Sequence, residues 1–242
     1  MKPNLPAYLC LKSEASAALR AALAACLLWA AAQAPAQVGP GAADAAAYSG
    51  LHAAAHRGDG AALLGLLAAG ADIDARDSHG RTALHVATFA RRPDLVRALA
   101  RAGAALGLLE NDRYDAVTIA AVADDEATLQ ALLAAGASAR LITSRYDGTA
   151  LIAAAHLGHD GVVRQLIAAG APLDHVNNLH WTALIESIVL GQGGPRHVAT
   201  LKALLDAGAS TRLADREGRT PLALAQALGY REMVRLLQAA PH

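Results

Sequence analysis

Aromatic residues are scarce in this sequence, at 3%, and charged residues make up only 17% of its 242 positions. The apolar fraction of 54% therefore consists mostly of alanine and leucine. Strands favour aromatic and β-branched side chains, whereas alanine and leucine lead the helix scale, so this composition argues against a β-sandwich and predicts an all-α fold. The high apolar content also excludes a disordered chain.

An excess of positive charge is also lacking. The chain has 21 Lys and Arg residues against 21 Asp and Glu residues, with a pI near 7.2. A protein that binds nucleic acid needs cationic side chains to neutralise phosphates. We therefore expect no nucleic acid partner.

The first 36 residues follow the order of a secretory signal peptide. Lys2, Lys12 and Arg20 precede an uncharged apolar stretch over 21–32, and the small residues Ala34-Pro35-Ala36 come next. This order predicts export, with cleavage after Ala36. The apolar stretch is shorter than the roughly 18 to 20 residues that span a membrane. An uncleaved leader that anchors the chain is the alternative.

Only two cysteines are present, Cys10 and Cys26, and both lie within this leader. A cleaved chain would therefore have no thiol for a disulfide, a metal site or a nucleophile. Leu23-Ala24-Ala25-Cys26 also resembles a lipobox, which would place a lipid on Cys26. We expect a periplasmic protein, with a membrane-anchored lipoprotein facing the periplasm as the alternative. Residues 37–47 are expected to form a linker.

Gly-Ala pairs recur through the rest of the chain at spacings of 33, 33, 34 and 38 residues. A leucine-rich segment precedes each pair, and an apolar residue 19 positions before the first four glycines opens another predicted helix. Each unit is thus a pair of helices that buries its apolar face only by stacking on its neighbours. The pairs are Gly70-Ala71, Gly103-Ala104, Gly136-Ala137, Gly170-Ala171 and Gly208-Ala209.

Two segments resemble the ankyrin repeat motif Asp-x-x-Gly-x-Thr-Pro-Leu-His-x-Ala. They begin at Asp77 (DSHGRTALHVA) and at Asp215 (DREGRTPL), and a period near 33 is the ankyrin value. The resemblance implies an all-α ankyrin-repeat solenoid of six stacked helix-turn-helix repeats with hairpin fingers. The repeats are expected at about 48–76, 77–109, 110–142, 143–176, 177–214 and 215–242.

Local chemistry explains several positions of the repeat. Threonines precede four of the first helices and are expected to cap them, and Asp115 takes this place in the third repeat. Gly80 suits the left-handed backbone of a hairpin, but Arg113 and His180 occupy its position in the third and fifth repeats. We therefore expect those two hairpins to differ in shape. The capping threonines are Thr82, Thr149, Thr182 and Thr220.

The fifth repeat contains five extra residues, because Leu184 lies 24 rather than 19 positions before its glycine. The glycines and proline of 191–197 predict a loop there, with a lengthened first helix as the alternative. The segment Asn177-Asn178-Leu179-His180-Trp181, followed by this insertion, resembles a subgroup of exported, single-domain bacterial ankyrin proteins. That resemblance implies a periplasmic protein partner, such as a stress-response enzyme, since some relatives are associated with catalases.

No catalytic motif is found among the common hydrolase, zinc-protease and phosphate-loop patterns. His52 and His56 stand one helical turn apart, as metal ligands do, and His156 and His159 form another close pair. However, His52 and His85 occupy the histidine of the repeat motif, which makes a structural hydrogen bond in the family. We expect no cofactor, no metal and no enzymatic activity. A histidine-based metal-handling protein or enzyme is the alternative.

The expected function is binding of a protein through the concave face, which hairpins and first helices line in stacked ankyrin repeats. Aromatic residues and arginines, the types that contribute most to interface affinity, occur on consecutive hairpins. Our hypothesis places Tyr114, Tyr146 and Trp181 at the centre of the face, flanked by Arg81, Arg145 and Arg219. The alternative is that these side chains stack on one another only to stiffen the hairpins.

Overall fold

A computed structural model describes residues 37–240. The signal peptide expected over 1–36, with its cleavage site and both cysteines, lies outside the described residues, as do residues 241–242. Within the described part of the chain, no helix is both long enough and apolar enough to cross a membrane.

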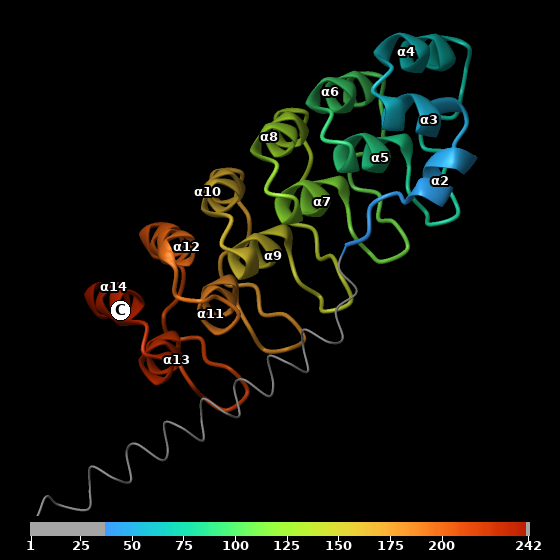
Figure 1. The fold of residues 1–242 in the computed structure, drawn as a ribbon. Coiled ribbons are helices and arrows are strands. Elements are labelled where there is room, and N and C mark those ends of the chain that lie inside the picture. Colours follow the sequence, from blue (N-terminus) through green and yellow to red (C-terminus); the bar gives the residue numbers. More distant parts are fainter. Residues whose placement is uncertain (1–36, 241–242) are drawn as a thin grey trace, which may run out of the picture.

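Twelve helices form six consecutive pairs, which follow one another along the molecule (Figure 1). The pairs are α3 (Gly50–Arg57) with α4 (Gly60–Ala68), α5 (Ala83–Phe89) with α6 (Pro93–Arg101), α7 (Ala116–Val122) with α8 (Glu126–Ala134), α9 (Ala150–Leu157) with α10 (Asp160–Ala168), α11 (Ala183–Val189) with α12 (Pro195–Asp206), and α13 (Pro221–Leu228) with α14 (Arg231–Ala239).

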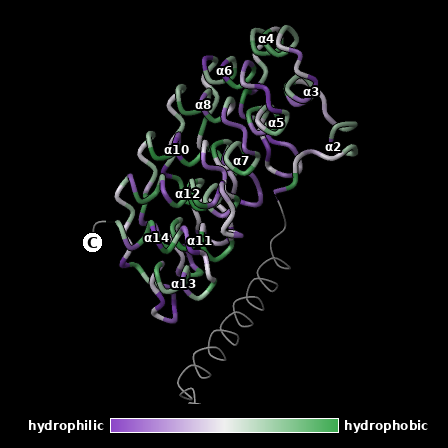
Figure 2. Tube along the Cα trace, turned by 60° about the vertical axis from the view of Figure 1, so that its left-hand side comes forward, coloured by the Kyte–Doolittle hydropathy of each residue, from purple (hydrophilic) through white to green (hydrophobic). Residues whose placement is uncertain are grey.

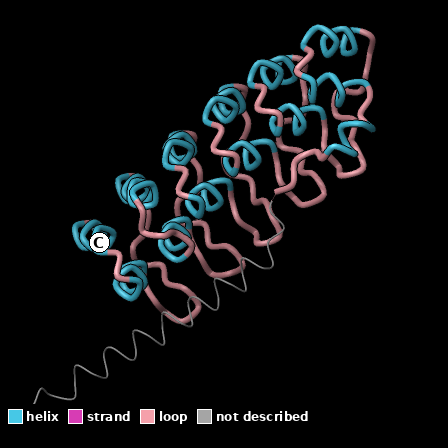
Figure 3. The backbone as a smooth tube through the Cα atoms, viewed as in Figure 1, coloured by secondary structure: helices cyan, strands magenta, loops and turns pink. Residues whose placement is uncertain are grey.

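The first helices of the pairs form one row and the second helices form another. Each helix contacts its counterpart in the next pair, α5 with α7 and α6 with α8 for example. The hairpins that precede the first helices project from the first-helix row (Figure 3). Residues 37–240 contain no strand, only an isolated bridge between Thr143 and Gly148. The expected all-α solenoid of stacked helix pairs is confirmed.

The core runs the whole length of the stack, and hydrophobic residues recur in every pair (Figure 2). Buried alanines such as Ala87 and Ala120 let adjacent first helices approach closely, while Leu99 and Leu132 fill the space under the second helices. Each pair therefore supplies part of its neighbour's core. Because protein cores are closely packed, losing these contacts would destabilise each pair, and the stability of one pair depends on the pairs beside it.

Helix ends form as the sequence predicts. Gly70 adopts a φ of 83°, and the amide of Ala71 donates to the Leu66 carbonyl at 3.0 Å, which terminates α4 in a Schellman arrangement. At the N-terminal end of α9, the Thr149 hydroxyl accepts the amide of Ile152 at 3.3 Å. Asp115 accepts the amide of Thr118 at 2.9 Å, so aspartate caps α7 in place of threonine.

The hairpins of repeats two, three, five and six share one backbone shape. Arg113 and His180 adopt φ values of 68° and 62°, close to the 73° of Gly80. The expectation that these hairpins differ is wrong, because the side chain that opens each hairpin accepts two backbone amides and offsets the steric cost. The acceptors are Asp77, Glu110, Asn177 and Asp215, and the amides lie two and four residues further on.

The fourth hairpin is the one that differs. It contains one more residue between its opening threonine, Thr143, and the cap at Thr149. The Thr143 amide therefore donates to the carbonyl of Gly148, at 2.8 Å, and both Ser144 and Asp147 have positive φ. Tyr146 lies within this longer turn.

The insertion in the fifth repeat is only partly a loop. Helix α11 has seven residues, like α5 and α7, so the first helix is not lengthened. The second helix, α12, begins at Pro195 and has twelve residues where the equivalent helices have nine. The expectation that Pro195, Arg196 and His197 belong to a loop is wrong, because proline suits the first turn of a helix. The hydroxyl of Tyr230 donates to the carbonyl of Gly191 at 3.0 Å and fixes the remaining loop.

Residues 37–47, expected as a linker, contain a short helix, α2 (Ala42–Ala47). This segment lies against the second repeat. Asp44 pairs with Arg81 at 3.1 Å, and the hydroxyl of Tyr48 donates to Asp77 at 2.8 Å. The N-terminal segment thus covers part of the second hairpin.

Candidate functional site

Tyr114 and Trp181 occupy equivalent places on the third and fifth hairpins, one residue before the helix cap. The amide of Tyr114 donates to Glu110 at 3.0 Å, and the amide of Trp181 donates to Asn177 at 3.0 Å. The backbone of both residues is therefore fixed by the hairpin itself, so each ring starts from a defined position.

All three predicted aromatic residues are partly exposed. Trp181 packs one side against the hydrophobic core, and burial raises the pKa of Tyr114, whose hydroxyl stays neutral at pH 7. Tyr146 is held by its amide, which donates to the hydroxyl of Ser144 at 3.2 Å. Rings that are half packed and half open offer a large apolar area at a small cost in conformational entropy.

Arg81 does not lie on an open surface. Its side chain is only 3% exposed, and its guanidinium pairs with Asp44 at 3.1 Å and with Asp77 at 3.3 Å. The expectation that Arg81 flanks the aromatic residues is therefore wrong. The reason is α2, which supplies Asp44 from 37 positions earlier in the chain and covers the arginine.

Arg145 and Arg219 are accessible but paired. Arg145 is 51% exposed and lies 3.7 Å from Asp112 on the third hairpin. Arg219 pairs with Asp215 and Glu217 on its own hairpin, at 2.6 Å and 2.8 Å. Exposed ion pairs contribute little to stability. A partner that supplies its own carboxylate can therefore take over Arg145 at low cost, whereas Arg219 also neutralises the buried Asp215 and can only add a further contact.

A buried carboxyl group beside the fifth hairpin was missed by the sequence prediction. The side chain of Glu186 on α11 is 6% exposed, and Asn177 Nδ2 donates to its Oε1 at 2.8 Å. His156 Nδ1 on α9 lies 3.6 Å from the other oxygen. Burial raises the pKa of Glu186 to about 8 and lowers the pKa of His156. The sequence does contain a sign of this buried carboxyl group, because the equivalent positions of the other first helices hold only apolar residues. These residues are Ala53, Val86, Ile119, Ala153 and Leu224.

The motif histidines make structural hydrogen bonds, as expected. His85 Nδ1 accepts the amide of Thr82 at 3.1 Å, so Nε2 carries the proton and donates to the Leu108 carbonyl at 3.0 Å. Burial lowers the pKa of His85 to about 4. His52 bonds to the carbonyl of Arg81 at 2.8 Å. Over residues 37–240, no three His, Cys, Asp or Glu side chains gather in a way that could hold a metal ion.

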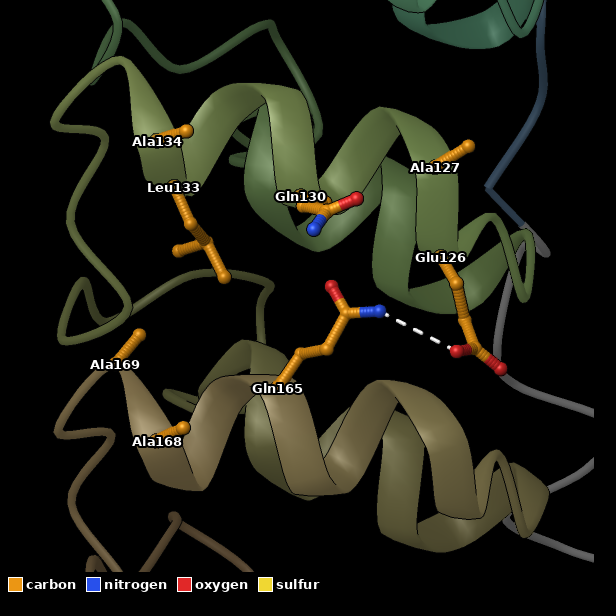
Figure 4. Close-up of a pocket in the computed structure, with 8 residues that line it drawn as sticks. All are labelled: Glu126, Ala127, Gln130, Leu133, Ala134, Gln165, Ala168 and Ala169. Atoms are coloured by element: carbon orange, nitrogen blue, oxygen red, sulfur yellow. Dashed lines mark hydrogen bonds between the residues drawn. The ribbon is translucent and has the colours of Figure 1, made fainter.

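An open groove of about 720 Å³ lies on the second-helix row, between α8 and α10 (Figure 4). One hydrogen bond crosses it, from Gln165 Nε2 to Glu126 Oε2 at 3.3 Å. None of the predicted binding residues lines this groove. The lining residues are Glu126, Ala127, Gln130, Leu133, Ala134, Gln165, Ala168 and Ala169.

Known proteins resemble this chain over most of its length. A family model described as ankyrin repeats (3 copies) matches residues 19–110, 51–143 and 117–210. A putative ankyrin repeat protein of Escherichia coli K12, YahD, is 35% identical over 188 residues, which cover 77% of this chain and 93% of YahD.

Solved structures agree with that relationship. An ankyrin repeat domain from Acinetobacter baumannii AYE is 43% identical, with a TM-score of 0.74, over 78% of this chain and 95% of that domain. The ankyrin repeat protein EF0377 is 29% identical, also with a TM-score of 0.74, over 80% of this chain and all of EF0377. The chain therefore belongs to the ankyrin repeat family.

Proposed function

We propose that this protein is a non-catalytic scaffold that binds another protein through hairpins three to six. Ankyrin repeats generally mediate protein–protein interaction. The observation that supports this particular surface is the row of partly exposed aromatic side chains on three consecutive hairpins. We name this surface the hairpin face, and it comprises Tyr114, Arg145, Tyr146, Trp181 and Arg219.

The composition of the hairpin face suits a protein partner. Interface affinity is concentrated in a few aromatic and arginine side chains that sit in well-packed surroundings. Trp181 and Tyr114 have fixed backbones and partly buried rings, so little conformational freedom is lost on binding. Arg81 is left out of the hairpin face because Asp44 already covers it.

The proposed place of action is the periplasm, and the support is the leader-like order of residues 1–36. The similarity to exported bacterial ankyrin proteins makes a periplasmic stress-response enzyme, such as a catalase, the first partner to test. N-terminal sequencing of protein recovered from the periplasmic fraction tests this location. A chain that starts at Gln37 supports it, whereas protein found only in the cytoplasm with Met1 intact contradicts it.

The hairpin face itself is tested by a triple variant, Tyr114→Ala with Tyr146→Ala and Trp181→Ala, used as bait after cross-linking in the native periplasm. We expect the partner recovered by the wild-type protein to be lost. A control variant changes three exposed residues of the second-helix row to alanine: Leu64, Arg164 and Arg235. If the triple variant keeps its thermal melt and still recovers the same partner at wild-type yield, the rings serve only to stiffen the hairpins.

A further inference from the structure

We infer that the Glu186 carboxyl group positions the fifth hairpin, and that its protonation controls where Trp181 lies. The consequence for partner binding rests on the proposed function of the hairpin face. The positional effect does not, because it follows from contacts inside this chain.

A continuous path of hydrogen bonds joins the carboxyl group to the tryptophan. Glu186 Oε1 accepts Asn177 Nδ2 at 2.8 Å, and Asn177 Oδ1 accepts the amides of Leu179 and Trp181, each at 3.0 Å. One amide side chain thus connects helix α11 with the turn of the hairpin. Any displacement of the carboxyl group acts directly on the residue that holds Trp181.

The second and sixth hairpins satisfy their opening residue differently, while the third opens with Glu110 and has Tyr114 four residues on. Asp77 and Asp215 also accept two backbone amides, but an arginine four residues on, Arg81 or Arg219, neutralises each carboxylate. In the fifth hairpin that fourth residue is Trp181, and the opening residue is the neutral Asn177. The NH₂ group of Asn177 needs a buried acceptor, and the carboxyl group of Glu186 is that acceptor. The equivalent position of the other first helices is apolar.

The surroundings of Glu186 give its ionisation a structural cost. Helix α13 contains no titratable residue, so the charged neighbours come from elsewhere. His156 faces the carboxyl group at 3.6 Å, and the charges of His159 and His197 act on His156. His197 Nε2 bonds to the carbonyl of His156 at 3.0 Å, which fixes the local backbone. Among the described residues, no lysine or arginine pairs with Glu186.

Burial therefore favours the protonated carboxyl, and the pKa of Glu186 is raised to about 8. An ionised carboxylate at this place has no lysine or arginine to pair with among the described residues, and burial lowers the pKa of His156, so the charge draws in water. Every residue of helix α11 is buried, so the helix is costly to move, whereas the hairpins project from the first-helix row (Figure 3). The opening with the smallest free-energy cost is a local displacement of the fifth hairpin, which carries Trp181 towards solvent.

Tryptophan fluorescence tests this coupling without any partner. The full chain contains two tryptophans, Trp29 and Trp181, so Trp29→Phe leaves Trp181 as the reporter. Between pH 6 and pH 9.5 we expect its emission to shift to longer wavelength, and iodide quenching to increase, with a midpoint near pH 8. Far-UV circular dichroism should stay constant over the same range.

The matched variant is Glu186→Gln, which keeps an acceptor for Asn177 and cannot ionise. We expect it to abolish the transition, while Glu110→Gln on the third hairpin leaves the transition in place. A flat wild-type titration, or a transition that survives in Glu186→Gln, overturns the inference. Either result leaves the triple-variant test of the hairpin face unaffected, so the two ideas can fail separately.

Partner binding adds a second measurement. If the hairpin face binds the partner, recovery at pH 8.5 should fall several-fold below recovery at pH 6.5 for wild-type protein, and Glu186→Gln should recover equal amounts at both pH values. Equal loss in both proteins would contradict a role for Glu186 in this regulation.

Discussion

The second and fifth hairpins have the same backbone and opposite electrostatics. In the second, Asp77 opens the turn and Arg81 neutralises it in a nearly buried ion pair that Asp44 completes. In the fifth, Asn177 opens the turn, and its amide donates to the buried carboxyl group of Glu186, whose pKa burial raises. Both arrangements give a left-handed residue at the fourth position of the turn, with φ values of 73° and 62°.

The difference shows two ways in which a hairpin can satisfy its opening side chain. In the second and sixth hairpins, the opening aspartate is paired with an arginine four residues on, Arg81 or Arg219. In the fifth hairpin the neutral Asn177 needs no cation, and Trp181 stands at that place. The third hairpin shows that an aromatic residue also occurs there with an acidic opener, because Tyr114 lies four residues after Glu110. The pH sensitivity that we infer is thus tied to Asn177 and Glu186 in the fifth hairpin alone, whereas an aromatic residue at this place is shared with the third hairpin.

The largest expected effect comes from breaking the stack that separates the two hairpins. Leu132 on α8 is fully buried between them. Leu132→Asp places a charge in the core, which costs more than about 4 kcal/mol, and both hairpins should unfold together. A thermal melt that combines circular dichroism with Trp181 emission measures this. Gln130→Asp, exposed on the same helix, is the control, and an unchanged midpoint for Leu132→Asp would refute the continuous core.

The next prediction compares the Asp77–Arg81 ion pair of the second hairpin with the neutral arrangement of the fifth. Arg81→Met removes the cation of the second hairpin and leaves the buried Asp77 with hydrogen bonds but no opposite charge, which should cost up to about 3 kcal/mol at pH 7. Adding Asp77→Asn should recover part of the loss, because it copies the neutral fifth hairpin. Urea denaturation of the three proteins measures both changes. A double variant less stable than Arg81→Met would show that the neutral arrangement does not transfer.

A third prediction concerns the sign of the pH dependence. The pKa of Glu186 rises from an ordinary value of 4.5 to about 8 on folding, so the native state holds an extra proton between these values. Stability therefore falls as pH rises through this window, by at most about 1.4 kcal/mol per pH unit. In urea denaturation at pH 5, 6.5 and 8, the free energy of unfolding of Glu186→Gln should rise steadily relative to that of wild type. A constant difference between the two proteins would contradict the buried neutral carboxyl.

The second hairpin should respond in the opposite direction. Its hydrogen bonds and Arg81 lower the pKa of Asp77, so its contribution is present above pH 4 and is lost as the pH falls below that value. The stability difference between wild type and Arg81→Met should consequently shrink at acid pH. Comparing this pair of proteins at pH 3 and pH 7 provides the measurement.

Much of the fold could be predicted because its causes are local. The spacing of the Gly-Ala pairs sets the repeat, and capping residues such as Asp115 act within a few positions of themselves. The shape of the third hairpin was predicted wrongly because the steric cost at Arg113 was weighed without the amides that Glu110 accepts. The compensation is also local, but it depends on geometry that the residue types alone do not reveal.

The candidate site was less predictable because its decisive contacts are distant in sequence. Arg81 looked like a surface residue, and the residue that covers it, Asp44, belongs to a segment outside the repeats. Glu186 interrupts an apolar pattern, which marks it as unusual. Only the stack shows that Asn177 and His156, from different repeats, surround it.

The smallest expected effect concerns the inserted segment, which the fifth repeat has and the second lacks. Arg196 reaches back across two repeats, with Nη1 at 2.8 Å from Asp124 and Nε at 3.2 Å from Asp160. Its side chain is 53% exposed, so Arg196→Ala should cost less than about 1 kcal/mol, and the loss should vanish at high salt. Denaturation with and without 1 M NaCl measures this, with Arg164→Ala as a control that lacks the contact across two repeats. A larger, salt-independent loss would mean that the insertion holds the fifth repeat in place, and the pH response of its hairpin would then depend on Arg196 as well as on Glu186.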